Sequence, residues 1–525
     1  MTLTTFPQNA ASEDHIQNSM EFFKEYIHAG NHSSEFNSTD VDDMKNFLSS
    51  MAMITPSHRE KVEMEIHGEQ VYVNPMTVDD LESEYTFVNW TVLLSEALSA
   101  NVSSSDIVYV PFPGYLDDLD MKIELLPAHT IHNGLLLMYR MDYLSAMADM
   151  LAPAPATQLK DMCLDLTKDM YPVPVAGMFV RDAGRGRLQQ LKDEVSVLLN
   201  DIKTVLTTSI ERKAAAEPSP VYSMALRKLR SLRSLLVASP SFWSDEFIAQ
   251  NTPTLPSLAP AVDHDQPDRH KVLRLIRAMQ AVRNFSIRKY QEVDTVSENY
   301  IWSQVSEPYE LNAFYFPDGN TVVVPLAFLS EPYFYDAVPQ YVKYATLGHV
   351  LSHELLHGLG VTGFQYDDSG RLRQLTEAER RQLAELRSCV RHNFVNNLTK
   401  IVHIQDIAIS AEPDGELTLD ENLSDHDALP LTWRAYQRWH HQHGSEPALP
   451  GVNLTLQQTF LLAWGQIYCA KLTQGTYIAS VETDAHLNNP ERVNAMMRHW
   501  PEFASSFHCA EGSPMRPSVQ CRPLW

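Results

Sequence analysis

Cysteine is scarce in this chain of 525 residues, and long apolar runs are missing. There are five cysteines, an odd number, so at least one of them has no partner within the chain. No run reaches the roughly 20 apolar residues of a transmembrane helix. The first residues also lack the apolar core of a signal peptide. The sequence therefore predicts no membrane span and shows no recognisable leader.

Basic residues are also scarce: there are 41 Lys and Arg against 66 Asp and Glu, and the net charge is −25. This balance argues against nucleic acid as a partner, because phosphate backbones attract positive charge. One local exception is Leu226–Arg233, where basic and apolar residues alternate as in an amphipathic helix. We interpret it as a solvated helix face rather than as a membrane or partner site. The length predicts two lobes rather than one small domain.

The most informative motif is LSHELLHGLG, residues 351–360. His353 and His357 are four residues apart, so on a helix they lie on one face and can hold one metal ion. Glu354 stands beside the first histidine, where a zinc peptidase has its general base. Apolar residues recur at helical spacing from Tyr341 to Gly360, which predicts a helix. The alternative is a buried helix whose histidines are polar groups satisfied within the core.

A catalytic zinc site needs a third protein ligand, and in one large class this is a glutamate on a later helix. Glu421 and Asp425 are four residues apart, directly before a predicted helix at His426–Trp439. One could bind the metal while the other fixes a ligand histidine. Taken alone, two such residues are more often helix caps or dipole partners. Their combination with the histidine motif favours the metal site.

Further segments occur in a fixed order: Glu310–Tyr315, Asn320–Pro325, Leu449–Val452, Gln466–Cys469, Thr483–His486, Phe507–Cys509 and Cys521–Trp525. With these, the chain resembles the neprilysin and endothelin-converting enzyme family of zinc metallopeptidases, strongly over residues 295–525 and weakly over 100–290. The resemblance implies a mainly α-helical, two-lobed zinc metallopeptidase that encloses a central cleft. Its catalytic lobe would be of the gluzincin type with a small β-sheet.

The resemblance also implies a domain organisation. Residues 1–30 would pack on the catalytic lobe, residues 31–290 would form the substrate-gating second lobe, and residues 291–525 the catalytic lobe. The second lobe is expected to be shortened, because residues 18–30 and 104–151 resemble parts of the family that lie far apart. Sequence patterns within this region predict helices at 184–212, 221–237 and 269–292, strands at 61–66 and 70–73, and a loop at 240–267.

Carried over residue by residue, the resemblance implies one zinc ion per chain, held by His353, His357 and Glu421. Glu354 would be the general base, Asp425 would orient a ligand histidine, and His486 would stabilise the oxyanion. Three further residues would bind the substrate: Arg492 a carbonyl group, and Asn312 and Ala313 the peptide main chain.

A pocket for the residue after the scissile bond is implied as well, lined by Phe328, Tyr333, His349, Val350, Ile467 and Tyr468. His349 stands where the family usually has an apolar residue. It lies one helical turn before His353, so it could be either a pocket wall or an extra metal ligand. We prefer the wall, because two turns of helix separate it from His357 by roughly 12 Å.

The family implies a disulfide bond between Cys389 and Cys521. Cys469 and Cys509 lack their usual partners near the N-terminus, so they either pair with each other or stay reduced, and Cys163 has also lost its partner. Glycosylation acceptors favour a secreted protein or a membrane-associated ectodomain; they are Asn31, Asn37, Asn89, Asn101, Asn284, Asn397 and Asn453. Asn422 also matches the acceptor pattern, but it lies in the proposed ligand helix.

The function predicted first is a zinc-dependent endopeptidase that cuts oligopeptides on the amino side of hydrophobic residues. Little preference for a free peptide C-terminus is expected, since no Arg occurs before Arg59 to match the family's carboxylate-binding arginine. The second interpretation is a catalytically silent protein that binds peptides. The third is a structural or interaction module whose zinc only stabilises the fold. The sequence predicts neither the natural peptide nor the oligomeric state.

Overall fold

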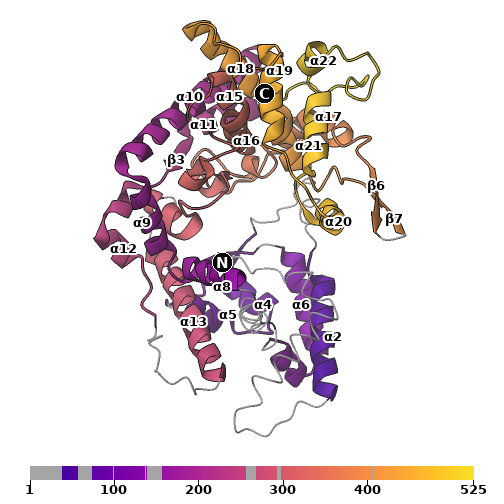
Figure 1. Ribbon diagram of the computed structural model, residues 1–525. Coiled ribbons are helices and arrows are strands. Elements are labelled where there is room, and N and C mark those ends of the chain that lie inside the picture. Colours follow the sequence, from indigo (N-terminus) through magenta and orange to yellow (C-terminus); the bar gives the residue numbers. More distant parts are fainter. Residues whose placement is uncertain are drawn as a thin grey trace. The chain divides into compact units, whose positions relative to one another are not determined.

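The computed structural model describes residues 38–56, 74–98, 100–110, 112–135, 138, 156–255, 268–292, 297–404 and 407–525. The protein is mainly helical with a few short strands, as predicted (Figure 1). It divides into two compact units. The strands predicted at 61–66 and 70–73 and the N-terminal segment 1–30 lie outside the described residues. In the described part, no helix combines the length and the apolar character needed to cross a membrane.

Of the described residues, the first unit contains those before Ala176 together with 244–292. Its elements are α2 (Ser38–Ile54), β1 (Pro75–Thr77), α4 (Val78–Glu84), α5 (Trp90–Leu98), β2 (Ile107–Tyr109), α6 (Pro113–Leu125), α8 (Ala156–Met170), α12 (Asp245–Gln250) and α13 (Asp268–Glu292). Apolar residues of α4 and α5, among them Leu81 and Trp90, share one buried cluster. α9 (Pro172–Ala183) crosses the boundary between the two units.

The second unit carries every residue of the predicted active site. Its helices are α10 (Arg185–Ala216), α11 (Pro220–Ser231), α14 (Glu298–Tyr300), α15 (Gln340–Lys343), α16 (His349–His357), α17 (Glu377–Asn393), α18 (Leu419–His443), α19 (Leu456–Gln466), α20 (Gln474–Thr483), α21 (Asn489–Arg498) and α22 (Pro501–Ser506). α16 packs against α10 and α18 within one apolar core (Figure 1). The two helices that carry the predicted ligands, α16 and α18, are therefore fixed against each other.

A three-stranded sheet stands beside these helices, in the order β3 (Arg233–Val237), β5 (Thr321–Pro325), β4 (Phe314–Phe316). β3 runs parallel to β5, and β4 runs antiparallel to it. β5 is buried along its whole length, as its Val-rich sequence favours. A separate hairpin is formed by β6 (Lys400–Ile404) and β7 (Ile407–Ala411).

Two predicted elements are wrong in part. The helix predicted at 221–237 ends at Ser231, and residues 233–237 form β3 instead. Their pairing with β5, almost 90 residues later in the chain, overrides the helical periodicity, which only registers local spacing. The loop predicted at 240–267 contains a 3-10 helix at Pro240–Trp243 and then α12.

The boundary between the units also differs from the predicted domain limits. Residues 176–243, predicted in the second lobe, form one compact unit with residues from 297 onward. α10 is the reason, because its buried face, including Leu198 and Ile202, belongs to the same core as the zinc-motif helix.

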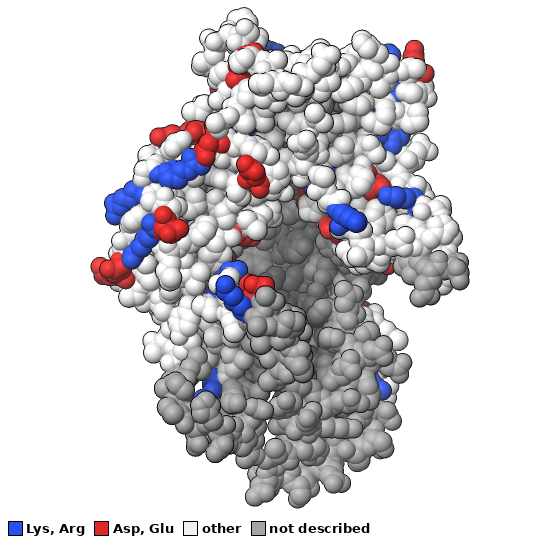
Figure 2. Space-filling model, in the orientation of Figure 1, with Lys and Arg blue, Asp and Glu red and all other residues white. Residues whose placement is uncertain are grey.

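On the face shown in Figure 2, acidic and basic side chains of the described residues lie interspersed.

Candidate active site

The HELLH motif lies on α16, as predicted. α16 is preceded by α15 and by one π-helical turn at Tyr344–Gly348. Leu351 and Leu355 are buried in the core, and the residues His353 and Glu354 are 6 and 7% exposed. The helix ends at His357, where the chain turns through a glycine-containing segment. The motif is thus held on a rigid, buried element.

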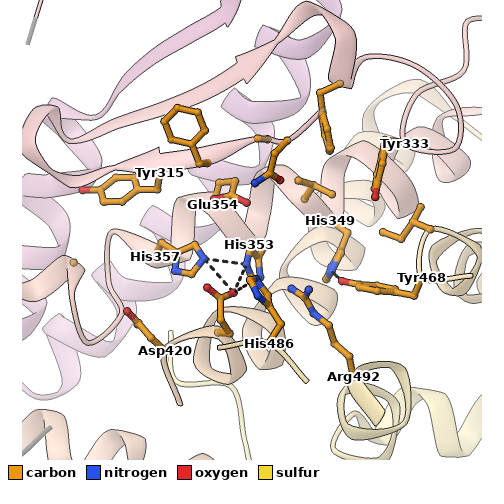
Figure 3. A pocket seen from close by; sticks show the side chains of 18 of the residues that line it. Tyr315, Tyr333, His349, His353, Glu354, His357, Asp420, Tyr468, His486 and Arg492 are labelled. Carbon is orange, nitrogen blue, oxygen red and sulfur yellow. Dashed lines mark hydrogen bonds and ion pairs between the residues drawn. The ribbon is translucent and has the colours of Figure 1, made fainter. Parts of the chain in front are cut away.

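α18 brings Glu421 to the two histidines of α16. Figure 3 shows the side chains of these histidines, His353 and His357, beside each other in the cavity. Oε2 of Glu421 lies 3.0 Å from Nε2 of His353 and 3.5 Å from Nε2 of His357, and the two nitrogens are 3.0 Å apart. Tetrahedral zinc with ligands at 2.0–2.2 Å requires ligand atoms about 3.3 Å apart. Two nitrogen lone pairs and a carboxylate oxygen at these distances fit one zinc ion.

Asp425, one turn after Glu421, binds the other side of His353. Its Oδ1 lies 2.9 Å from Nδ1 of that histidine, and its carboxylate is 1% exposed. Arg492 of α21 donates to both carboxylate oxygens, through Nη2 at 2.8 Å and through Nε. Burial opposes the charge of Asp425, but Arg492 and His353 hold its pKa well below the usual range. The ring of His353 is therefore oriented with Nε2 toward the other candidate metal ligands, Glu421 and His357.

Glu354 and Glu421 face the same cavity, but their surroundings shift their pKa values in opposite directions. Burial raises the pKa of Glu354. Burial acts in the same direction on Glu421, but the neighbouring charge of His357 and hydrogen bonds from the histidines lower its pKa well below the ordinary value. The surroundings therefore favour proton uptake by Glu354 and the anionic form of Glu421, which is the form that binds a metal.

His486 comes from the loop between α20 and α21. Its Nε2 lies 3.0 Å from Oε2 of Glu421, and its Nδ1 lies 2.9 Å from Oδ1 of Asp484. Burial disfavours the imidazolium, but Glu421 and Asp484 raise the pKa of His486 to about 9. His486 is thus held as a donor at the mouth of the site. The sequence analysis assigns no role to Asp484, although its position two residues before a predicted catalytic histidine could have indicated one.

These side chains surround a cavity of about 460 Å³. All of the predicted substrate-binding residues line it: Asn312, Ala313, Phe328, Tyr333, His349, Val350, Ile467, Tyr468 and Arg492. Asn312 and Ala313 directly precede β4. Phe328 and Tyr333 are stacked at 4.4 Å between ring centroids. Asp425 lies behind the lining, since only its contacts with His353 and Arg492 connect it to the cavity.

His349 is a wall of this cavity, and its Nε2 lies 2.7 Å from the hydroxyl oxygen of Tyr468. Burial lowers the pKa of His349 to about 3, so the ring is neutral at physiological pH. The guanidinium of Arg492 lies 5.2 Å from the centre of the Tyr468 ring. A hydrogen-bonded polar pair thus replaces an apolar wall.

The turn after His357 is fixed by residues that the sequence did not identify. Asp420 accepts hydrogen bonds from the backbone of Val361 at 2.6 Å and Thr362 at 3.2 Å, and a Cβ at Gly360 would overlap its carboxylate. Lys228 of α11 donates to the carbonyl oxygens of Gly363 at 2.7 Å and Tyr366 at 3.0 Å. The prediction of a solvated helix face is wrong for Lys228, which is 1% exposed.

The predicted disulfide bond joins Cys389 of α17 to Cys521 near the C-terminus. Cys163, Cys469 and Cys509 are free, so the alternative in which Cys469 and Cys509 pair is not found. After Cys521, the last two residues donate their backbone N–H groups to Asp427 of α18 at 3.0 and 2.9 Å. The C-terminal tail is therefore tied to the helix that carries Glu421.

A histidine pair on one helix, a glutamate between them and a second glutamate from a later helix define the class of zinc-dependent metallopeptidases. Residues 4–236 and 312–523 match two models that are both described as peptidase family M13. The chain belongs to this family, which is zinc-dependent, and the predicted resemblance is confirmed.

Two relatives illustrate the range of similarity. Endothelin-converting enzyme-like 1 of Homo sapiens is 27% identical over 496 residues, which cover 90% of this chain and 58% of the relative. Neprilysin-21 of Caenorhabditis elegans is 32% identical over 237 residues, 44% of this chain and 30% of the relative. The chain thus spans little more than half of the length of the curated relatives that it matches across most of its own length.

Solved structures share the fold at low identity. A zinc metalloprotease of Mycobacterium tuberculosis, ZMP1, solved in complex with an inhibitor, has a TM-score of 0.72 at 18% identity and covers 100% of this chain and 78% of its own. The Haemonchus galactose containing glycoprotein complex also has a TM-score of 0.72, at 21% identity, with coverages of 99 and 76%. These matches support the mainly helical fold.

Proposed function

We propose that the protein is a zinc-dependent endopeptidase that hydrolyses oligopeptides on the amino side of hydrophobic residues. The observation that carries this proposal is the convergence of His353, His357 and Glu421, whose donor atoms lie 3.0–3.5 Å apart beside the buried Glu354. Membership of a peptidase family supports peptides as the substrates.

Zinc, when bound by His353, His357 and Glu421, supplies a Lewis acid that polarises the scissile carbonyl and makes a water molecule more acidic. Glu354 takes the proton of the attacking water and passes it to the leaving amide nitrogen. His486 donates to the carbonyl oxygen as negative charge develops there, and Asp484 keeps its ring in place. Asp425 keeps His353 in the tautomer that leaves Nε2 free.

The cavity lining supports the preference for a hydrophobic residue after the scissile bond. Phe328 and Tyr333 form a stacked aromatic wall, and Ile467 and Val350 add aliphatic surface. Asn312 and Ala313 supply amide and backbone groups for the peptide main chain at the same cavity. Since no arginine matching the family's carboxylate-binding residue was found in the sequence, we also propose little preference for a free peptide C-terminus.

The test measures zinc content and hydrolysis of internally quenched peptides by the full chain, with and without a chelator. Glu354→Gln should keep zinc and lose hydrolysis by at least about 100-fold. Glu385→Gln, an exposed position of α17, is the matched control and should behave as wild type. Bound zinc without turnover in the wild type would support the silent peptide-binding alternative. Absence of zinc would contradict the proposal.

A separate experiment tests the preference for a free C-terminus in the peptide substrate. Cleavage of one peptide with a free and with an amidated C-terminus should proceed at similar kcat/KM. A large preference for the free acid would contradict this part of the proposal and leave the endopeptidase activity intact.

We also propose that the protein passes through the secretory route, as a secreted protein or an ectodomain. The disulfide bond and the exposed acceptor residues support this: Asn89, Asn101, Asn284, Asn397 and Asn453 are all exposed. Asn422 is 1% exposed within α18 and should stay unmodified. Glycosidase treatment and peptide mapping of the protein from secretory cells would test the proposal, which unmodified acceptors throughout would contradict.

A further inference from the structure

The two ring nitrogens of His357 face different neighbours. Nε2 faces His353 and Glu421, at 3.0 and 3.5 Å. Nδ1, on the opposite side of the ring, lies 3.3 Å from the hydroxyl oxygen of Ser424. Ser424 is 1% exposed, and its contact with the ring places an oxygen of α18 against His357.

An imidazole can bind a metal through Nε2 only when that nitrogen carries a lone pair, so the ring proton must reside on Nδ1. At His353 this proton faces the carboxylate of Asp425 at 2.9 Å. At His357 the equivalent position is occupied by the Ser424 hydroxyl. The longer distance agrees with a neutral acceptor, because hydrogen bonds to carboxylates are shorter.

We propose that Ser424 is the positioning residue of His357. Its hydroxyl oxygen accepts the Nδ1 proton and holds the ring with Nε2 directed at the zinc position. The inference rests on the proposed zinc site and assigns a role to a residue outside the cavity lining. Three residues of one α18 turn then build the zinc site: Glu421 is a ligand, Ser424 is the partner of His357, and Asp425 is the partner of His353.

The surrounding charges explain why a neutral residue suits position 424. The same two turns of α18 carry Asp420, Glu421, Asp425 and Asp427, and the last two of these are buried. A further carboxylate beside Glu421 would add a buried like charge, which costs more than a hydroxyl acceptor does. Serine supplies the oxygen without the charge. His357 is consequently held less firmly than His353.

The experiment measures zinc affinity and the rate of zinc release by competition with a chelator of known affinity. Ser424→Ala should weaken zinc binding by about 10-fold, the lower end of the effect of losing an outer partner of a metal ligand. Ser424→Thr keeps the oxygen and should stay close to wild type, while Ser424→Val, which has nearly the same shape without the oxygen, should match the alanine variant.

Ser352→Ala is the matched control. Ser352 is equally buried on α16 but donates to the carbonyl oxygen of Gly348 at 2.9 Å, away from the ligands, so zinc affinity should not change. Equal affinity and release for the threonine and valine variants would overturn the proposal, even if the alanine variant fails to fold. A wild-type protein that binds zinc but cuts no peptide would contradict the proposed function and leave this inference standing.

Discussion

Among single residues, the polar pair in the cavity wall is the feature with the most direct consequence for specificity. His349 and Tyr468 are bonded to each other at 2.7 Å inside an otherwise aromatic and aliphatic lining. Nε2 of His349 and the Tyr468 hydroxyl satisfy each other, so a hydrophobic residue can be accommodated, but the wall is less apolar than leucine would make it.

We expect His349→Leu to raise the preference for leucine over asparagine after the scissile bond by about 10-fold, since the wall loses its polar edge. The measurement is the ratio of kcat/KM for two quenched peptides that differ only at this residue. Tyr468→Phe breaks the same hydrogen bond but keeps the imidazole, and it separates loss of the bond from loss of the ring. An unchanged ratio in His349→Leu would show that this wall does not contact the substrate.

Lys228 is a second residue whose burial has a measurable effect. Burial lowers its pKa to about 8, although Asp367 partly opposes the shift. Between pH 8 and 10.5 the unfolded chain therefore binds more protons at this residue than the folded chain, and the free energy of unfolding rises with pH.

Relative to Lys228→Met, we expect the wild-type free energy of unfolding to rise by up to about 3 kcal/mol over this pH range, at about 1.4 kcal/mol per pKa unit. Urea unfolding at several pH values measures the difference, in which the other lysines cancel. The variant also removes the two hydrogen bonds that Lys228 donates to backbone carbonyl groups, which costs about 1–3 kcal/mol in total at any pH. A pH-independent difference would contradict the assigned pKa shift.

At the level of elements, α18 links the metal site to the C-terminus. Its first two turns carry Glu421 and Asp425, and Asp427 receives the last two backbone N–H groups of the chain. His499, at the end of α21, completes this attachment by accepting the backbone N–H of Cys521 on Nδ1 at 3.0 Å. The tail is held by an unprotonated histidine.

Burial, together with the neighbouring His426, lowers the pKa of His499 to about 4. Between pH 6.5 and 4 the unfolded chain takes up a proton that the folded chain refuses, so stability falls as the pH falls. With a chelator present, we expect this proton uptake to lower the free energy of unfolding by up to about 3 kcal/mol. His499→Asn keeps an acceptor but does not titrate, so its stability should depend less on pH in this window. Equal slopes for both proteins would exclude His499 as the source.

Much of the candidate site was predictable, because its strongest signal is local. The spacing of His353 and His357 is a helical period, and a resemblance in fixed order located Glu421, Asp425 and His486. Asp420 and Ser424 were not identified, since their partners are a backbone turn and a ring nitrogen on another helix. β3 was read as helix for the same reason: its partner β5 is distant in sequence. Contacts between distant segments leave no periodicity to read.

At the scale of the whole molecule, the chain divides into two compact units that differ in their stabilising features. The second unit contains the candidate zinc site and the disulfide bond. It also contains seven of the eight tryptophans, because Trp90 alone belongs to the first unit. A ligand that binds only the folded form of one unit stabilises that unit and leaves an independent unit unchanged.

We therefore expect urea to unfold the protein in two steps, only one of which depends on zinc. In Trp90→Phe, fluorescence reports the second unit alone, and free zinc at 100 times its Kd should stabilise this step by about 2.7 kcal/mol relative to chelator. Circular dichroism follows both units and should contain a further step whose midpoint is the same with zinc and with chelator. If both probes instead gave one coincident transition that moved as a whole with zinc, the two units would unfold cooperatively, and the metal site would stabilise the entire chain.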